Sequence, residues 1–295
     1  MDAASRGRVR RSVAADGAAQ TAARPATAKG GNSIIFVEQS CTAPSDKRGG
    51  PQVSRAADGL GENGAPGRPG PHPPRAMNIY QTQLRSDEID ALAHREMVGG
   101  LWDEIGQLQF DFMRARGLLP GDRLLDVGCG ALRGGVHFVR YLDPGRYCGL
   151  DLNASLIEAG KRELAAAGLD GRGASLLVDD AFDVSRFGCR FEWALAVSVF
   201  THLPMNQIVR CLAEVKKVLA PGGRLFASYF EAPASAHLAP LRHPPADIVT
   251  RYDADPYHQS ADELAALAHF AGMTMERIGA WNHPRGQRML AFAAG

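Results

Sequence analysis

Two acidic residues end two successive apolar runs in the middle of this 295-residue chain, and their spacing suggests ligand chemistry. Asp126 stands in LLDVGCGALRGG (residues 124–135), and Asp151 ends the run CGLD about 25 residues later. A glycine-rich turn after a strand lets the backbone approach a ligand closely. An acid at the end of the next strand can accept hydrogen bonds from both hydroxyls of a ribose. The pattern therefore predicts a site for an adenosine-containing ligand.

The acid in the glycine turn discriminates between such ligands. A dinucleotide would place its diphosphate over this turn, and two like unit charges about 4 Å apart repel by about 4 kcal/mol at an effective dielectric near 20. S-adenosylmethionine (SAM) has no phosphate, and its ammonium and sulfonium groups favour a nearby carboxylate. A charge-assisted hydrogen bond there contributes roughly 1.5–3 kcal/mol. Asp126 therefore favours SAM over a phosphorylated cofactor.

Short apolar runs alternate with helical patterns after residue 122, which predicts a parallel sheet with helices on both faces. The expected strands are 123–127, 146–151, 174–178, 191–199 and 223–230, and the expected helices are 133–142, 153–167, 205–219 and one beginning at Ser260. The last two runs, 273–279 and 287–293, have a link too short for a parallel crossover, so they should pair antiparallel. The predicted fold is α/β: a doubly wound, mostly parallel sheet with an antiparallel terminal hairpin.

Residues 1–76 differ in composition from the rest of the chain. They contain eleven Gly and eight Pro, a quarter of the segment, and cannot bury enough apolar surface to offset the entropy of ordering. We expect this segment to be disordered and residues 77–295 to form the domain, with Met77 as an alternative start of the protein. Ser86 is expected to cap the first of the N-terminal helices, which occupy about 86–116.

Charge and cysteine content restrict the partners and the compartment. Residues 1–76 hold eleven of the 33 basic and six of the 32 acidic residues, which leaves 22 basic and 26 acidic residues in 77–295. This mildly acidic part gives no support for nucleic-acid binding. The five cysteines show no CxxC spacing, so a reducing cytoplasm is predicted. No run approaches the roughly 18 apolar residues of a membrane span, so no membrane partner is expected.

The sequence LLDVGCG followed by GLDL resembles motifs of class I SAM-dependent methyltransferases, and the resemblance covers about residues 118–293. The terminal hairpin is similar to the end of the seven-stranded, Rossmann-like sheet of that family. HREMVGGLWDEIG before the first strand and HPRGQRML near the end resemble a bacterial subgroup of the family. The turn departs from many members because it lacks a third glycine two residues after Gly130.

The resemblance implies which residues contact the methionine part of SAM. These are Asp126, Gly128, Cys129, Gly130 and Ser198. Arg133, also in the turn, either binds the carboxylate of SAM or pairs with a nearby acid.

The resemblance also implies how the adenosine is held. Asp151 would bind the ribose, with its side chain near solvent, and Leu152 would pack on the adenine. Asp180 would accept a hydrogen bond from the exocyclic amine, and the Ala181 amide would meet the edge of the ring. Asp179 could exchange roles with Asp180, although an acidic turn without a ligand is a common feature. No metal site is predicted from these acids.

His202, in SVFTHLP after the fourth strand, is the candidate catalytic residue, because its pKa can be tuned near neutrality for a general base. Alternatively, it only shapes the entry into the next helix. The long connection 231–259 either arches over the acceptor pocket or is a mobile surface loop.

These observations predict methyl transfer from SAM to a small molecule, on O, N or C. One alternative is an NAD(P)-dependent oxidoreductase, since Gly128, Gly130 and Gly134 fit a spacing of that class. The other alternative is a SAM-binding protein without catalytic activity.

Overall fold

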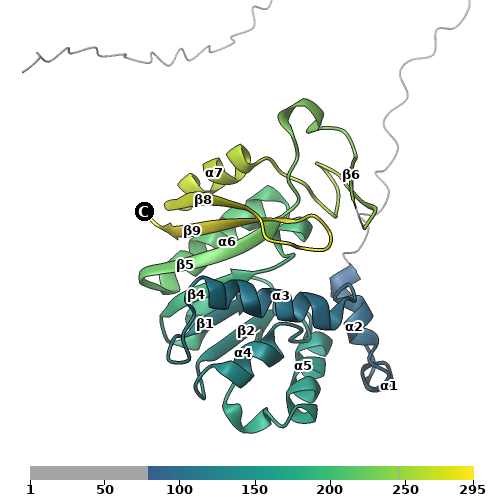
Figure 1. Ribbon diagram of the computed structural model, residues 1–295, viewed down its shortest axis with the longest axis vertical. Helices are drawn as coiled ribbons and strands as arrows, with labels where there is room; N and C mark the ends of the chain where they lie inside the picture. Colours follow the sequence, from purple (N-terminus) through teal and green to yellow (C-terminus); the bar gives the residue numbers. More distant parts are fainter. Residues whose placement is uncertain (1–78, 245) are drawn as a thin grey trace, which may run out of the picture. The chain divides into compact units, whose positions relative to one another are not determined.

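The computed structural model describes residues 79–244 and 246–295, so the segment 1–76 lies outside the described residues. Seven strands form one sheet in the order β3-β2-β1-β4-β5-β9-β8 (Figure 1). They are β1 (Leu124–Val127), β2 (Tyr147–Asp151), β3 (Ser175–Val178), β4 (Phe191–Ala196), β5 (Leu219–Tyr229), β8 (Met273–Ala280) and β9 (Arg288–Ala294). The first five pair in parallel, whereas β9 pairs antiparallel with β5 and β8. The mostly parallel sheet with a terminal antiparallel hairpin is therefore confirmed.

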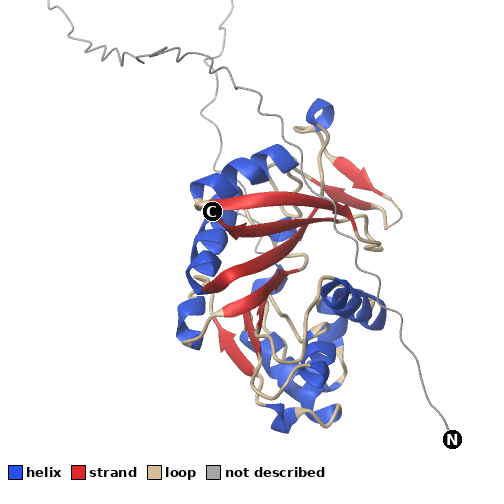
Figure 2. Ribbon diagram, turned by 60° about the vertical axis from the view of Figure 1, so that its left-hand side comes forward, coloured by secondary structure: helices blue, strands red, loops and turns tan. Residues whose placement is uncertain are grey.

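Helices cover both faces of this sheet (Figure 2). They are α3 (Trp102–Ala115), α4 (Gly135–Tyr141), α5 (Ala154–Ala166), α6 (Met205–Val218) and α7 (Ala261–Phe270). Successive side chains of a strand point to opposite faces. Leu124 accordingly packs in the buried cluster that holds Met113 of α3, and Leu125 packs in the cluster that holds Leu264 of α7. The doubly wound arrangement follows from this alternation.

Strand β4 ends at Ala196, three residues earlier than predicted. Ser198 adopts a left-handed backbone conformation (φ 60°), and the chain then enters a short 3-10 helix, η4 (Phe200–His202). The backbone N–H of Ser198 donates to Ser228 Oγ at 2.7 Å, which fixes this bend against β5. The bend places Ser198 and His202 at the carboxyl end of the sheet.

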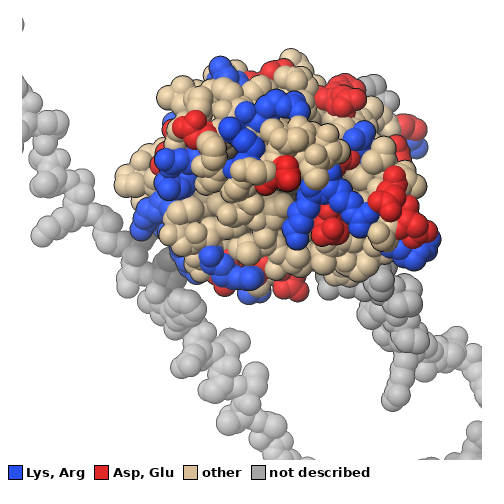
Figure 3. Space-filling model, turned by 90° about the horizontal axis from the view of Figure 1, so that it is seen from below, with Lys and Arg blue, Asp and Glu red and all other residues tan. Residues whose placement is uncertain are grey.

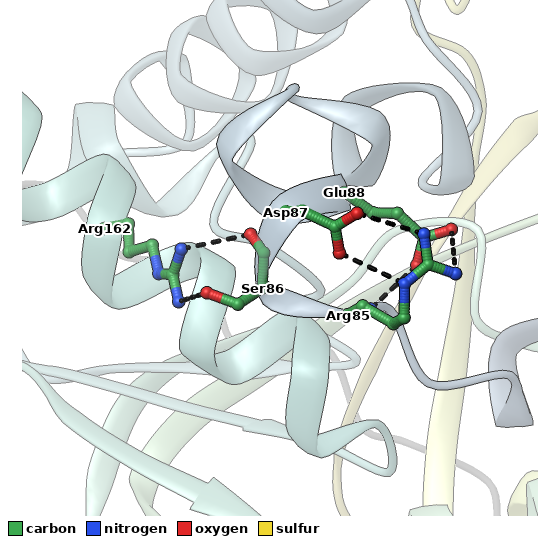
Figure 4. A network of polar contacts seen from close by, with 5 residues as sticks. All are labelled: Arg85, Ser86, Asp87, Glu88 and Arg162. Atoms are coloured by element: carbon green, nitrogen blue, oxygen red, sulfur yellow. Dashed lines mark hydrogen bonds and ion pairs between the residues drawn. The ribbon is translucent and has the colours of Figure 1, made fainter.

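Two short helices, α1 (Ser86–Asp90) and α2 (Ala93–Met97), precede α3. The predicted cap is wrong, because Arg85 occupies the N-cap position and Ser86 is the first helical residue. The Ser86 hydroxyl instead accepts a hydrogen bond of 2.9 Å from Arg162 Nη2 of α5 (Figure 4). The N-terminal helices are thus anchored on α5 through side chains that sequence periodicity does not pair.

The described part of the connection 231–259 has structure of its own. It contains a two-stranded antiparallel sheet of β6 (Leu241–His243) and β7 (Ile248–Thr250). The buried Thr250 Oγ1 lies 2.7 Å from Nδ1 of the buried His258. The Tyr257 N–H donates to the Thr201 carbonyl oxygen at 2.7 Å, which ties this connection to η4.

Candidate active site

The turn after β1 requires glycine at two positions. Gly128 (φ 68°) and Gly130 (φ 53°) lie in the left-handed region that favours glycine. A Cβ atom on Gly128 would stand 2.5 Å from Cγ2 of Val199. The Gly130 N–H donates to Asp151 Oδ2 at 2.9 Å. These contacts hold the turn against the ends of β2 and β4.

A cavity lies beside this turn, at the carboxyl ends of β1, β2 and β4. The predicted site residues that line it are Asp126, Gly128, Cys129, Gly130, Arg133, Asp151, Leu152, Ser198 and His202. Asp180 and Ala181 are not part of its lining. The structure therefore brings nine of the eleven predicted residues together. The cavity encloses about 120 Å³, which is small beside the roughly 300–1,000 Å³ of most small-molecule sites.

Asp126 is a buried acid in the floor of this cavity, with 4% of its surface exposed. The Tyr147 hydroxyl donates to its Oδ2 at 2.7 Å. Burial raises the pKa of Asp126 to about 7, although the bond from Tyr147 opposes the shift. Burial and the neighbouring Asp126 raise the pKa of the Cys129 thiol well above its usual range. Cys129 is therefore a neutral wall residue, whereas Asp126 changes charge near neutral pH.

Asp151 is half-buried and holds the glycine turn and α5 together. Its Oδ2 accepts from the Gly130 N–H and its Oδ1 from the Asn153 N–H, both at 2.9 Å. Burial raises the pKa of Asp151, and these backbone bonds lower it again. The side chain is partly exposed at the cavity, and the carboxylate also has a structural role. Each oxygen keeps a further acceptor position for a ligand hydroxyl.

Arg133 is a buried cation without an acidic partner among the described residues. Its Nη1 donates to the carbonyl oxygens of Val98 (3.0 Å) and Gly100 (2.8 Å), and its Nε has no hydrogen-bond partner among the described residues. Burial and the neighbouring Arg285 lower the pKa of Arg133 to about 10, so it stays charged at neutral pH. Of the two predicted alternatives, pairing with an acid is not what the structure has.

The turn after β3 differs in detail from the adenine-binding role implied for it. Asp179 Oδ1 accepts from the Ala181 N–H at 2.8 Å and from the Asp183 N–H at 2.9 Å. The Ala181 amide is therefore engaged within the turn, and so is Asp179. Asp180 is exposed, which leaves it as the acid of this turn that can meet a ligand. Leu152, 37% exposed, presents an apolar side chain to the cavity.

His202 makes contacts that link three distant segments of the chain. Its Nδ1 lies 2.5 Å from Oδ1 of Asp255, which comes from the connection after β7. Its Nε2 lies 3.3 Å from the hydroxyl of Tyr80, which precedes α1 and also lines the cavity. When the His202 Nδ1–H donates a hydrogen bond to the Asp255 carboxylate, Nε2 is the unprotonated, basic nitrogen. The arrangement can accept a proton from a hydroxyl placed in the cavity.

Sequence reasoning missed Tyr80, Tyr147 and Asp255. Tyr80 and His202 are separated by 122 positions, and His202 and Asp255 by 53. Contacts of this range leave no local pattern in the sequence. The one available signal for Tyr147 was its place four residues before Asp151 on the same strand.

Comparisons with known proteins show what part of the chain is similar to. Residues 124–223 match the family model Methyltransf_25, described as a methyltransferase domain. The chain is 38% identical over 107 residues to a phthiotriol/phenolphthiotriol dimycocerosates methyltransferase of Mycobacterium ulcerans, covering 36% of this chain and 37% of that protein. It is 35% identical over 148 residues to ribosomal RNA small subunit methyltransferase C of Pseudomonas aeruginosa, covering 47% and 40%. These matches span about two fifths of the length of the two relatives.

The CcbJ methyltransferase of Streptomyces caelestis has a similar fold, with a TM-score of 0.54 at 14% identity, over 74% of this chain and 98% of that one. The part of the chain that matches the methyltransferase model spans β1 to the first residues of β5, and the strand order is that of a doubly wound sheet with an antiparallel terminal hairpin. This result favours a methyltransferase over the NAD(P)-dependent oxidoreductase that glycine spacing alone allowed.

Two further properties bear on the site. Among residues 79–244 and 246–295, no group of three or more His, Cys, Asp or Glu side chains is placed to hold a metal ion. In the same part of the chain, no helix combines the length and the apolar character needed to cross a bilayer.

Proposed function

We propose that this protein transfers a methyl group from SAM to a small-molecule acceptor. The observation that carries the proposal is the cavity in the methyltransferase domain, lined by the ionisable Asp126, the turn-holding Asp151 and the unpaired cation Arg133. The Asp126 carboxylate can interact with an ammonium and a sulfonium, and Asp151 can accept hydrogen bonds from ribose hydroxyls. Arg133 can pair with a carboxylate. SAM carries all of these groups, whereas a dinucleotide carries a diphosphate.

The residue roles follow from these contacts. Asp126 and the turn Gly128–Gly130 hold the methionine end, and the free N–H of Arg133 receives the SAM carboxylate. Asp151 binds the ribose hydroxyls. Leu152 packs on the adenine and Asp180, exposed on the neighbouring turn, accepts from its amine.

When bound, SAM supplies an electrophilic methyl group on its sulfonium. The protein then has to exclude water and hold the acceptor in line, and orientation alone can give effective molarities on the order of 10⁵ M. Where the acceptor is a weakly acidic hydroxyl, His202 Nε2 takes its proton and Asp255 stabilises the imidazolium that forms. This assignment requires the Tyr80 hydroxyl to leave Nε2 when the acceptor enters.

A small molecule suits the acceptor better than a nucleic acid. On the face shown in Figure 3, basic and acidic side chains are interspersed instead of forming an extended basic patch. The acidic balance of residues 77–295 agrees with this. Because one relative is named for ribosomal RNA, ribosomal subunits belong in the acceptor screen. The four free cysteines of the described residues support our proposal of a reducing, cytoplasmic compartment.

Calorimetry of the full chain with SAM and with NADPH tests the cofactor. We expect SAM to bind and NADPH not to bind; the reverse result refutes the proposal. Asp151→Asn should weaken SAM binding roughly tenfold or more, because a charge-assisted bond to the ribose is lost. Asp262→Asn, at an exposed acid on α7 that does not line the cavity, is the matched control.

Methyl transfer from radiolabelled SAM to a metabolite panel then separates an enzyme from a binding protein. With an active acceptor, His202→Gln should lower kcat and flatten the pH profile while leaving SAM affinity unchanged.

A further inference from the structure

A second cavity, of about 390 Å³, lies between the end of β5 and the loop of the terminal hairpin. Its lining includes Glu231 and His243 on one side and Trp281, His283 and Gln287 on the other. The volume falls within the range of small-molecule sites.

Two residues of this lining carry buried N–H groups with no partner. Trp281 Nε1 and His283 Nε2 have no hydrogen-bond acceptor among the described residues, and each residue is only 6% exposed. Their rings stack with centroids 5.2 Å apart, so the two groups belong to one rigid unit. A buried donor without a partner costs about 1–3 kcal/mol, which a ligand oxygen would recover.

The histidine is a neutral donor. The Arg285 N–H donates to His283 Nδ1 at 3.2 Å, so the ring proton resides on Nε2. Burial, Arg133 and Arg285 lower the pKa of His283 to about 3. The unpaired atom is therefore an N–H across the whole physiological pH range.

The surrounding field is positive. Neither Arg133 nor Arg285 forms an ion pair with a carboxylate in the described part of the chain, and Arg285 Nη2 donates to the Gly99 carbonyl oxygen. Glu231, the acid of this cavity, lies 3.6 Å from Arg288, which offsets its charge. Two neutral donors in a positive field select an oxyanion that only accepts hydrogen bonds.

One side chain joins this cavity to the first. Gln287 Oε1 accepts from the hydroxyls of Ser228 at 2.6 Å and Ser198 at 3.2 Å. Ser198 lines the first cavity and Gln287 lines the second. A ligand that spans Gln287 would reach from the second cavity to the residues assigned to the methyl donor.

We propose that the hairpin cavity binds a carboxylate of the methyl acceptor through the N–H groups of Trp281 and His283. The assignment of this ligand as the acceptor rests on the proposed methyl transfer; the carboxylate site itself does not. The acceptor would then be a carboxylic acid whose nucleophile reaches past Gln287.

The three tryptophans of the chain make a direct test feasible. The full chain, labelled with ¹⁵N-tryptophan, gives three indole N–H signals, and Trp281→Phe assigns one of them by its loss. If that variant does not fold, Trp102→Phe and Trp193→Phe assign it by elimination. Sodium acetate should shift the Trp281 signal in a saturable manner, with an affinity in the millimolar range. The Trp193 N–H, already bonded to Asp122 at 2.9 Å, is the internal control.

Sodium chloride at equal ionic strength is the blank. His283→Phe should weaken the acetate response roughly tenfold, because one donor is lost while the ring stack remains. Asn282→Gly, which lines the same cavity and keeps the left-handed backbone (φ 64°), should leave it unchanged. A Trp281 signal that does not move beyond the chloride blank overturns the carboxylate site. Separate SAM calorimetry on the same sample shows whether the proposed function fails independently.

Discussion

Asp126 has a carboxylate whose charge depends on what binds beside it. It forms no ion pair in the described part of the chain, and burial raises its pKa to about 7. A nearby cation would stabilise the ionised form, whereas a nearby phosphate would keep the acid protonated. A cationic ligand therefore causes Asp126 to release protons on binding, whereas an anionic ligand causes it to take protons up.

We predict that SAM binding at pH 6 releases protons from the wild-type protein, because the cation lowers the pKa of Asp126. Calorimetry in two buffers of different ionisation enthalpy measures the number released. Asp126→Asn should abolish most of this release and weaken SAM binding about tenfold. Proton release that is equal in the two proteins would contradict the assigned role of Asp126.

At the scale of elements, most of the fold could be predicted because it depends on local patterns. The alternation of short apolar runs with helical patterns predicted every strand of the main sheet. The short link between the last two runs predicted the antiparallel hairpin. The glycine turn directly follows β1 and Asp151 is the last residue of β2, so their place in the cavity was predictable as well. The hydrogen bond between Ser86 and Arg162 could not be predicted, because it depends on how two helices pack together.

The site residues that could not be predicted depend on contacts between distant segments or on competing local hydrogen bonds. Tyr80 and Asp255 contact His202 only in the folded protein, where three segments distant in sequence lie together. Ala181 was expected to face a ligand, but the local bond to Asp179 competes for its amide. Such competition between equivalent donors and acceptors is decided by geometry and is not visible in spacing.

The segment that carries Tyr80 also limits the size of the cavity. Asn153 Nδ2 donates to the carbonyl oxygens of Tyr80 and Thr82, both at 2.8 Å, and so fastens this segment to α5. The cavity volume of about 120 Å³ lies below the roughly 300–1,000 Å³ of most small-molecule sites. We therefore expect this segment to move outward when SAM enters.

We predict that Asn153→Asp speeds SAM association, measured by stopped-flow fluorescence. Aspartate keeps the side-chain oxygen that caps α5 at Ser155 and Leu156, but it loses the two bonds to the segment. Hydrogen exchange at residues 80–84 should rise. Ser155→Ala is the milder control. It loses the bond from the Leu84 N–H and the hydroxyl's bond to Asn153 Oδ1, but it keeps both Asn153 bonds to the segment. An unchanged association rate with faster exchange would show that this segment does not gate the site.

At the scale of the whole molecule, the site residues inside the family match differ in role from those outside it. The family match ends at residue 223, and it contains the glycine turn, Asp151 and His202. Tyr80, Asp255 and Trp281 lie outside it. The residues that we assign to the acceptor side thus lie mostly in the parts of the chain that the family model does not cover.

The composition of residues 1–76 predicts that they add nothing to the core. Deleting them should leave both the melting temperature and the SAM affinity unchanged, measured by calorimetry against the full chain. A clear fall in either quantity would show that the segment belongs to the domain.

The buried Asp126 should make the free energy of unfolding depend on pH. The pKa of Asp126 in the folded protein, about 7, exceeds its ordinary value of 3.8, so the folded state binds the proton more tightly. The contribution of Asp126 to stability is therefore largest at low pH and is lost as pH rises from about 4 through 7. Asp126→Asn removes this dependence, since the amide oxygen can still accept from Tyr147.

Urea unfolding at pH 5 and pH 8 measures the difference between the two proteins. Relative to the wild type, Asp126→Asn should gain on the order of 2 kcal/mol between these pH values. Tyr147→Phe is the comparison variant, because it removes the bond that favours the ionised acid and should steepen the loss of stability with pH. A constant difference between wild type and Asp126→Asn would mean that Asp126 titrates alike in both states, and the charge-based choice of SAM would then lose its physical basis.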